Sequence, residues 1–249
     1  MRLPDFIIGG APRSGTTWLY ELLARHPSVY MARPVKPEPK FFLVDDLYRN
    51  GLRWYADRWF AGAPLDRVAG EKSTDYLESA PAAERIARDL PAVKLVFILR
   101  EPAARAYSNF LWTRMNGLET EEFATALALE AERERTLPER WRFARPFSYF
   151  SRGLYAELLE PYLDRFPRER ILVLRFEDIQ ERTAEVADTL HRFLGVAPRP
   201  DDADGIGVIN PSEKRGEALD EALKCDLQAR YTDSNRRLAA LLGPDFRLW

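Results

Sequence analysis

The sequence is poor in the side chains that form disulfides and hold metals. Among its 249 residues there are one cysteine and two histidines. Cys225 therefore cannot form an internal disulfide, and these three side chains are too few soft ligands for a zinc site. We expect no metal and a reducing, cytoplasmic compartment.

Long apolar runs and an excess of charge are also missing. No stretch of about 18 apolar residues occurs and no apolar leader follows Met1, so we expect no membrane insertion and no targeting segment. The 37 Lys and Arg nearly balance the 39 Asp and Glu, and the net charge of −2 offers no global attraction to nucleic acid. Any anion site must be local, and the 46% of hydrophobic residues suffice for a single domain over 1–249.

Short apolar segments alternate with longer helical patterns along the chain. The expected strands are 6–8, 68–70, 95–99 and 171–175, and the expected helices are 16–26, 103–115, 121–134, 154–166, 183–194 and 219–242. This alternation predicts an α/β fold with a P-loop-like central parallel β-sheet flanked by helices on both faces. The alternation weakens in 117–150, which we expect to be a substrate-facing helical insertion.

The segment GAPRSGTTW, residues 10–18, joins the first expected strand to the first expected helix. Gly10 and Gly15 have the spacing of a phosphate-binding loop, where backbone N–H groups and a helix dipole suit an anion. A triphosphate loop would carry lysine where Thr16 stands, whereas the cation here is Arg13. The loop therefore favours one terminal phosphate, with a P-loop kinase or NTPase and an ordinary tight turn as the alternatives.

A second anion-binding element is LREPAARAYS, residues 99–108. Arg100 is expected at the end of a strand, and Ser108 lies two helical turns further on, on an otherwise apolar face. An arginine fork and an inward hydroxyl can share one phosphate. The alternative pairs Arg100 with Glu101 or Glu71 and lets Ser108 bond to its own helix. Two such sites in one sheet imply a ligand with two separated phosphates.

Taken in order, segments along the chain resemble those of the sulfotransferases that use 3′-phosphoadenosine 5′-phosphosulfate (PAPS). Within that family the resemblance is to the glycan branch, which includes the heparan sulfate sulfotransferases and many bacterial relatives. The matching segments are GAPRSGTTWLYELLARHP, PEPKFF, WYADRWF, GEKSTDYL, LVFILREPAARAYS, GLYAELLEPYLDRFPRERILVLRFEDI and YTDSNRRLAALLG. The resemblance covers nearly the whole chain. It implies in-line transfer of a sulfuryl group from PAPS to a hydroxyl or amine of a glycan or small molecule. Adenosine 3′,5′-bisphosphate would be the product, and no metal would take part.

The resemblance also implies a catalytic base. Glu38 matches the glutamate of the Glu-x-His-Phe-Phe segment of the glycan branch, but Pro37 precedes it and Lys40 replaces the histidine. Lys36 is a further catalytic candidate in the same segment. Without the resemblance, KPEPK is typical of a polyproline-like surface turn with solvated charges. A nucleotide-binding module without catalysis is therefore a third possible function.

Two cations complete the catalytic set that the resemblance implies. Arg13 would stand by the leaving phosphate, and Lys72 of GEKS would lie near the sulfuryl group. The alternative for Lys72 is an exposed lysine that pairs with Glu71 or Asp75.

The remaining residues assigned by the resemblance bind the nucleotide. Arg13, Ser14, Gly15, Thr16, Thr17 and Trp18 would hold the 5′-phosphate, Arg100 and Ser108 the 3′-phosphate, with Tyr155 in the nucleotide pocket and Lys214, Arg215 and Gly216 in a basic loop that closes over it. A helix-core role for Tyr155 and a solvated loop at 214–216 are the alternatives. Acceptor specificity is expected in 33–60 and 113–150.

Overall fold

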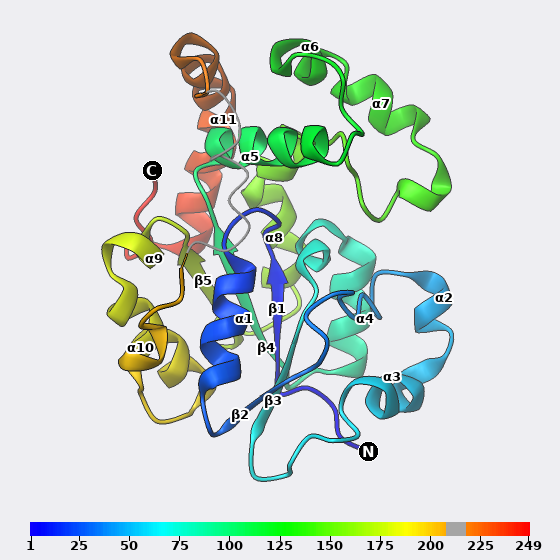
Figure 1. The fold of residues 1–249 in the computed structure, drawn as a ribbon, viewed down its shortest axis with the longest axis vertical. Coiled ribbons are helices and arrows are strands. Elements are labelled where there is room, and N and C mark those ends of the chain that lie inside the picture. Colours follow the sequence, from blue (N-terminus) through cyan, green and yellow to red (C-terminus); the bar gives the residue numbers. More distant parts are fainter. Residues whose placement is uncertain (208–217) are drawn as a thin grey trace. The chain divides into compact units, whose positions relative to one another are not determined.

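The computed structural model describes residues 1–207 and 218–249 (Figure 1). The described chain forms two compact units, one from residues 1–99 and 161–207 and the other from 100–160 and 218–249. The single domain over 1–249 stays a prediction.

The first unit contains a five-stranded sheet in the order β2-β3-β1-β4-β5, with every neighbouring pair parallel. The strands are β1 Phe6–Gly10, β2 Val29–Met31, β3 Val68–Lys72, β4 Lys94–Leu99 and β5 Ile171–Arg175. The four expected strands are confirmed. The edge strand β2 was missed because its three residues carry too little periodicity. Since all strands are parallel, their carboxyl ends share one edge, where ligands bind in sheets of this kind.

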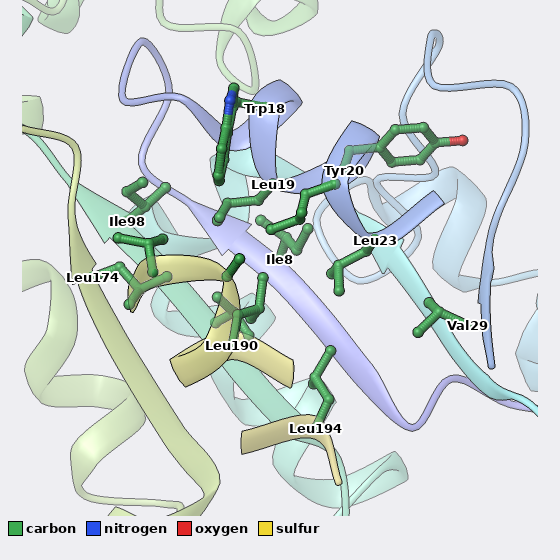
Figure 2. Packing of buried hydrophobic residues seen from close by; sticks show 14 of the residues in the cluster. Ile8, Trp18, Leu19, Tyr20, Leu23, Val29, Ile98, Leu174, Leu190 and Leu194 are labelled. Carbon is green, nitrogen blue, oxygen red and sulfur yellow. The ribbon is translucent and has the colours of Figure 1, made fainter. Parts of the chain in front are cut away.

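Both faces of the sheet are buried, as predicted for a parallel sheet. The helical elements of this unit are α1 Thr16–Arg25, α2 Asp45–Tyr48, α3 Gly51–Trp59, η1 Thr74–Glu78, α4 Ala80–Asp89, η4 Arg168–Arg170, α9 Asp178–Glu181, α10 Thr183–Leu194 and η5 Pro200–Ala203. On one face Ile8 and Ile98 pack against Leu19 of α1 and Leu190 of α10 (Figure 2). On the other face Phe97 is fully buried, with its ring centroid 5.0 Å from that of Tyr162.

The second unit is helical. Its elements are α5 Pro102–Met115, α6 Phe123–Ala128, α7 Glu130–Thr136, η2 Glu139–Trp141, η3 Ser151–Gly153, the start of α8 Tyr155–Leu163, and α11 Glu221–Leu242. Its core joins Phe110 of α5 to Leu227 and Tyr231 of α11. Within 1–207 and 218–249, no helix combines the length and the apolarity needed to cross a bilayer.

One expected helix of the second unit is wrong. The segment 121–134 forms α6 and α7 in place of a single helix. Glu130, the first residue of α7, is buried and accepts hydrogen bonds from the backbone N–H groups of Phe150 (2.6 Å) and Ser151 (2.8 Å). This contact joins residues 20 positions apart in the chain, so the local apolar periodicity could not predict where the helix breaks.

Candidate functional site

The loop of residues 10–18 connects β1 to α1, as the glycine spacing predicts. Gly15 is the N-cap of α1 with φ 88° and ψ 11°, in the left-handed region that favours glycine. A Cβ at this position would lie 2.8 Å from Cδ2 of Phe176 and 2.9 Å from Cδ1 of Ile179. Arg13 is half-buried and also has a positive φ, 67°. Conformation and space therefore both require glycine at position 15.

The start of α1 provides donors for an anion. The first helical hydrogen bonds run from the N–H groups of Trp18 (2.9 Å) and Leu19 (3.2 Å) to the carbonyl of Gly15. The N–H groups of Thr16 and Thr17 precede this ladder and point out of the helix end. The ring of Trp18 packs in the core (Figure 2), which gives this candidate a packing role.

Ser14 fits the same anion. Its side chain is fully buried, and within residues 1–207 and 218–249 its Oγ has no hydrogen-bond partner. A buried hydroxyl without a partner costs about 1–3 kcal/mol. Donation to a phosphate in the loop would remove that cost, so the loop fits a phosphate group.

Glu38 forms an ion pair with the buried Lys72. Lys72 is the last residue of β3 and its side chain is 3% exposed, against 12% for Glu38. The second carboxylate oxygen of Glu38 accepts hydrogen bonds from the N–H (3.0 Å) and hydroxyl (3.2 Å) of Thr74. The alternative of an exposed Lys72 paired with Glu71 or Asp75 is therefore wrong.

The reading of KPEPK as a solvated turn holds for only part of the segment. Lys36 is exposed, whereas Glu38 is tied to Lys72. Lys40, which replaces the family histidine, forms an ion pair with Asp75. The segment is therefore anchored at two of its charged residues and presents a third to solvent.

Thr74 connects this pair to the phosphate loop. A Cβ on Gly10, the first residue of the loop, would lie 2.9 Å from the carbonyl oxygen of Thr74. One residue earlier, the N–H of Ser73 donates to the carbonyl of Ile8 at 3.1 Å. The carboxylate of Glu38, held by Thr74, therefore lies at the same edge of the sheet as the loop.

Glu71 is a buried acid that the sequence suggested only as a possible ion-pair partner of Arg100 or Lys72. Its carboxylate is fully buried and accepts hydrogen bonds from the hydroxyls of Tyr55 (2.8 Å), Ser73 (2.7 Å) and Tyr76 (3.1 Å). Burial raises the pKa of Glu71 to about 7. The available signal was its position: Glu71 directly follows the expected strand 68–70, and the structure extends that strand to Lys72, so that its carboxylate is enclosed.

The second unit holds the residues assigned to the 3′-phosphate. Arg100 follows the last residue of β4, and its carbonyl accepts a hydrogen bond from the Tyr155 hydroxyl at 2.9 Å. Ser108 lies on α5 and is 2% exposed, so its predicted inward position is confirmed. Glu101 caps α5 by accepting from two N–H groups of its first turn. The candidates Lys214, Arg215 and Gly216 lie outside the described residues.

One cluster has ligand types suited to a metal. In the described parts of the chain, His26, His191 and Asp202 offer ligand atoms within 4.8 Å of one another. However, Nδ1 of His26 accepts from the N–H of Ser28 (3.1 Å), and its Nε2 lies 2.9 Å from the carbonyl of Ala197. Both nitrogens of that ring are committed to the backbone, so we assign no metal to the cluster.

Known proteins resemble this chain in sequence and in fold. The family model of the sulfotransferase domain matches residues 3–207. The human bifunctional heparan sulfate N-deacetylase/N-sulfotransferase 3 is 30% identical over 214 residues, covering 79% of this chain and 23% of that protein. The mouse heparan sulfate glucosamine 3-O-sulfotransferase 3B1 is 31% identical over 198 residues, covering 78% and 47%. This chain thus spans less than half the length of either relative.

A solved structure is also similar over its full length. It is the crystal structure of a sulfotransferase from Alicyclobacillus acidocaldarius, with 29% sequence identity and a TM-score of 0.81. The match covers 99% of this chain and 98% of that one. The α/β architecture expected from the sequence is therefore shared with a solved relative.

Proposed function

The chain belongs to the sulfotransferase domain family, and from this membership we propose that it moves a sulfuryl group from PAPS to a hydroxyl or amine acceptor, a glycan or a small molecule. The observation that carries the proposal is the ion pair of Glu38 and Lys72, which Thr74 links to Gly10, the first residue of the phosphate loop. A base, a cation and an anion cradle thus meet at one sheet edge.

Transfer needs a base for the acceptor's proton and cations for the charge that develops on the leaving oxygen. Glu38 takes the proton from the acceptor O–H or N–H. The acceptor atom bonds to sulfur while the bond from sulfur to the bridging oxygen of the 5′-phosphate breaks, and adenosine 3′,5′-bisphosphate leaves. Lys72 stabilises the sulfuryl oxygens and Arg13 the bridging oxygen. Lys36 stays a catalytic candidate on sequence grounds alone.

The loop binds the 5′-phosphosulfate. The N–H groups of Gly15, Thr16 and Thr17 and the hydroxyls of Ser14, Thr16 and Thr17 are its proposed donors. The buried Ser14 hydroxyl supports this assignment, because an anion would supply the acceptor that this donor lacks within 1–207 and 218–249. The absence of lysine at position 16 fits a donor that needs no γ-phosphate contact.

Arg100 and Ser108 are proposed to bind the 3′-phosphate. The family resemblance and the burial of Ser108 support this assignment. Tyr155 is proposed to hold Arg100 in place through its hydrogen bond to the Arg100 carbonyl. The acceptor and the cytoplasmic compartment stay predictions. Relatives named for N-sulfation and for 3-O-sulfation match the chain about equally, so either acceptor atom fits.

The test combines nucleotide binding with transfer. Isothermal titration calorimetry should detect binding of adenosine 3′,5′-bisphosphate. Adenosine 5′-monophosphate should bind only weakly, because it lacks the 3′-phosphate. Sulfur-35 from labelled PAPS should then pass to a member of a panel of amino glycans, hydroxyl glycans and phenols. Glu38→Gln should abolish this transfer and keep the nucleotide affinity.

Two outcomes would replace the proposal. Nucleotide binding without transfer across the panel would favour a binding module. Magnesium-dependent binding of ATP, with none of adenosine 3′,5′-bisphosphate, would favour a P-loop kinase or NTPase.

A further inference from the structure

We infer that Glu71 is a positioning residue for the catalytic base: through the hydroxyls of Ser73 and Tyr76 it holds residues 40–42, the stretch that follows Glu38. The inference rests on the proposed role of Glu38. It assigns a function to a buried acid that touches neither the phosphate loop nor Lys72 through any hydrogen bond or ion pair found in the described chain.

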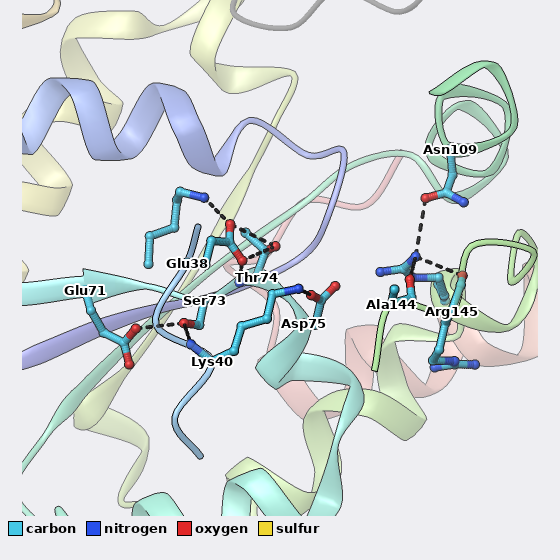
Figure 3. A network of polar contacts seen from close by, with 11 residues as sticks. Glu38, Lys40, Glu71, Ser73, Thr74, Asp75, Asn109, Ala144 and Arg145 are labelled. Atoms are coloured by element: carbon cyan, nitrogen blue, oxygen red, sulfur yellow. Dashed lines mark hydrogen bonds and ion pairs between the residues drawn. The ribbon is translucent and has the colours of Figure 1, made fainter. Parts of the chain in front are cut away.

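The first arm of the contact runs through Ser73 (Figure 3). Its Oγ donates to Oε2 of Glu71 at 2.7 Å and accepts from the N–H of Lys40 at 2.9 Å. A hydroxyl has one hydrogen and two lone pairs. Because Glu71 takes the hydrogen, a lone pair of Ser73 is left to face the N–H of Lys40.

The second arm runs through Tyr76 and has the same polarity. The Tyr76 hydroxyl donates to Oε1 of Glu71 at 3.1 Å and accepts from the N–H of Phe42 at 3.2 Å. Tyr76 is fully buried. Two backbone N–H groups of one short stretch therefore depend on hydroxyls whose direction is set by a single carboxylate.

Packing alone does not require an acid at this position. A buried carboxylate is costly, and in the described structure hydroxyl donors, not a cation, surround the oxygens of Glu71. The groups that face it are Tyr55 from α3, Ser73 and Tyr76 after β3, and the negative charge of Glu38. Their hydroxyls stabilise the ionised form, which burial disfavours.

Tyr55 supplies a matched control for Tyr76. Both tyrosines are fully buried and both donate to Oε1 of Glu71, Tyr55 at 2.8 Å. Of these two tyrosines, only Tyr76 also accepts a hydrogen bond from a backbone N–H of residues 40–42 in the described chain. Tyr55→Phe and Tyr76→Phe therefore each remove one hydroxyl group from a fully buried side chain. Only the second change should affect residues 40–42, the stretch after Glu38.

The experiment compares Glu71→Gln, Tyr76→Phe and Tyr55→Phe with the wild type at about pH 8.5, above the pKa of Glu71. The glutamine side chain introduced by Glu71→Gln would be neutral and would turn its NH₂ group toward one of the hydroxyls. We expect Glu71→Gln and Tyr76→Phe to lower kcat about tenfold, with KM for PAPS and nucleotide affinity unchanged. Tyr55→Phe should stay close to wild type.

Hydrogen exchange measured by NMR gives a readout that needs no activity. The amide proton of Lys40 or that of Phe42, depending on which arm the new NH₂ group faces, should exchange faster in Glu71→Gln. The amide proton of Phe42 should exchange faster in Tyr76→Phe and stay unchanged in Tyr55→Phe. Unchanged exchange in Glu71→Gln, or equal effects of the two tyrosine variants, would overturn the inference. If Glu71→Gln does not fold, the tyrosine pair decides. A wild type without sulfuryl transfer, combined with the expected exchange pattern, would instead refute the proposed function.

Discussion

Replacing Lys72 by methionine should leave the carboxylate of Glu38 without its cation. Methionine keeps an unbranched stem of similar length and removes the charge. Lys72 is 3% exposed and Glu38 is 12% exposed, so water cannot take over the lost contact fully. Removing one partner of a buried pair costs about 3–5 kcal/mol. The hydrogen bonds from Thr74 to Glu38 remain, which places the expected loss near 3 kcal/mol at about pH 7.5.

The loss can be traced to the pair by a double-mutant cycle. Glu38→Gln combined with Lys72→Met removes both charges, and the two changes together should cost less than their sum by about 1–3 kcal/mol. Urea unfolding followed by tryptophan fluorescence gives the free energies, since the chain has 6 tryptophans. Lys36→Met is the matched control: this lysine lies in the same segment as Glu38 but is exposed, and its loss should stay within about 0.5 kcal/mol.

Additive losses in the cycle, or equal stability of Lys72→Met and Lys36→Met, would show that Glu38 and Lys72 are not paired in solution. The proposed role of Lys72 would then lose its geometric support. Transfer activity is a separate readout, and Lys72→Met should reduce it more strongly than it reduces nucleotide affinity.

Three further results are expected. Arg13→Ala should lower kcat about 100-fold and change the affinity for adenosine 3′,5′-bisphosphate little. Arg100→Ala should weaken that affinity, measured by calorimetry, about 10- to 100-fold. The reverse pattern would exchange the roles of the two arginines. Gly15→Ala should lower the free energy of unfolding in urea by about 1–3 kcal/mol more than Gly51→Ala does. Both glycines have a positive φ, 88° and 80°, but a Cβ at position 15 would meet Phe176 and Ile179, whereas a Cβ at position 51 would meet no atom within 4 Å in the described structure. The folded state keeps the proton of Glu71 up to about pH 7, because burial raises its pKa, whereas the unfolded chain loses it near the ordinary pKa of 4.5. The wild type should therefore lose about 3 kcal/mol of stability relative to Glu71→Gln as the pH rises from 4.5 to 7, and parallel pH profiles would contradict this.

Local patterns were sufficient for most of the sheet. Apolar runs bounded by turns identified four strands, and the glycine spacing identified the loop between β1 and α1. They failed where a tertiary contact decides the outcome. β2 lies at the edge of the sheet and pairs there with β3. The break between α6 and α7 accompanies the contact of Glu130 with residues 150 and 151.

The candidate site divides in the same way. The sequence by itself determined the strand, loop and helix that form an anion cradle, because the spacing of Gly10 and Gly15 acts over a few residues. It also supplied Glu38 and Lys72, but not their contact. Neighbouring residues on a strand point to opposite faces, so Glu71 and Lys72 on β3 face different surroundings. Only the tertiary structure, which brings Glu38 across 34 residues of chain, decided that Lys72 meets the base and that Glu71 faces a cluster of hydroxyls.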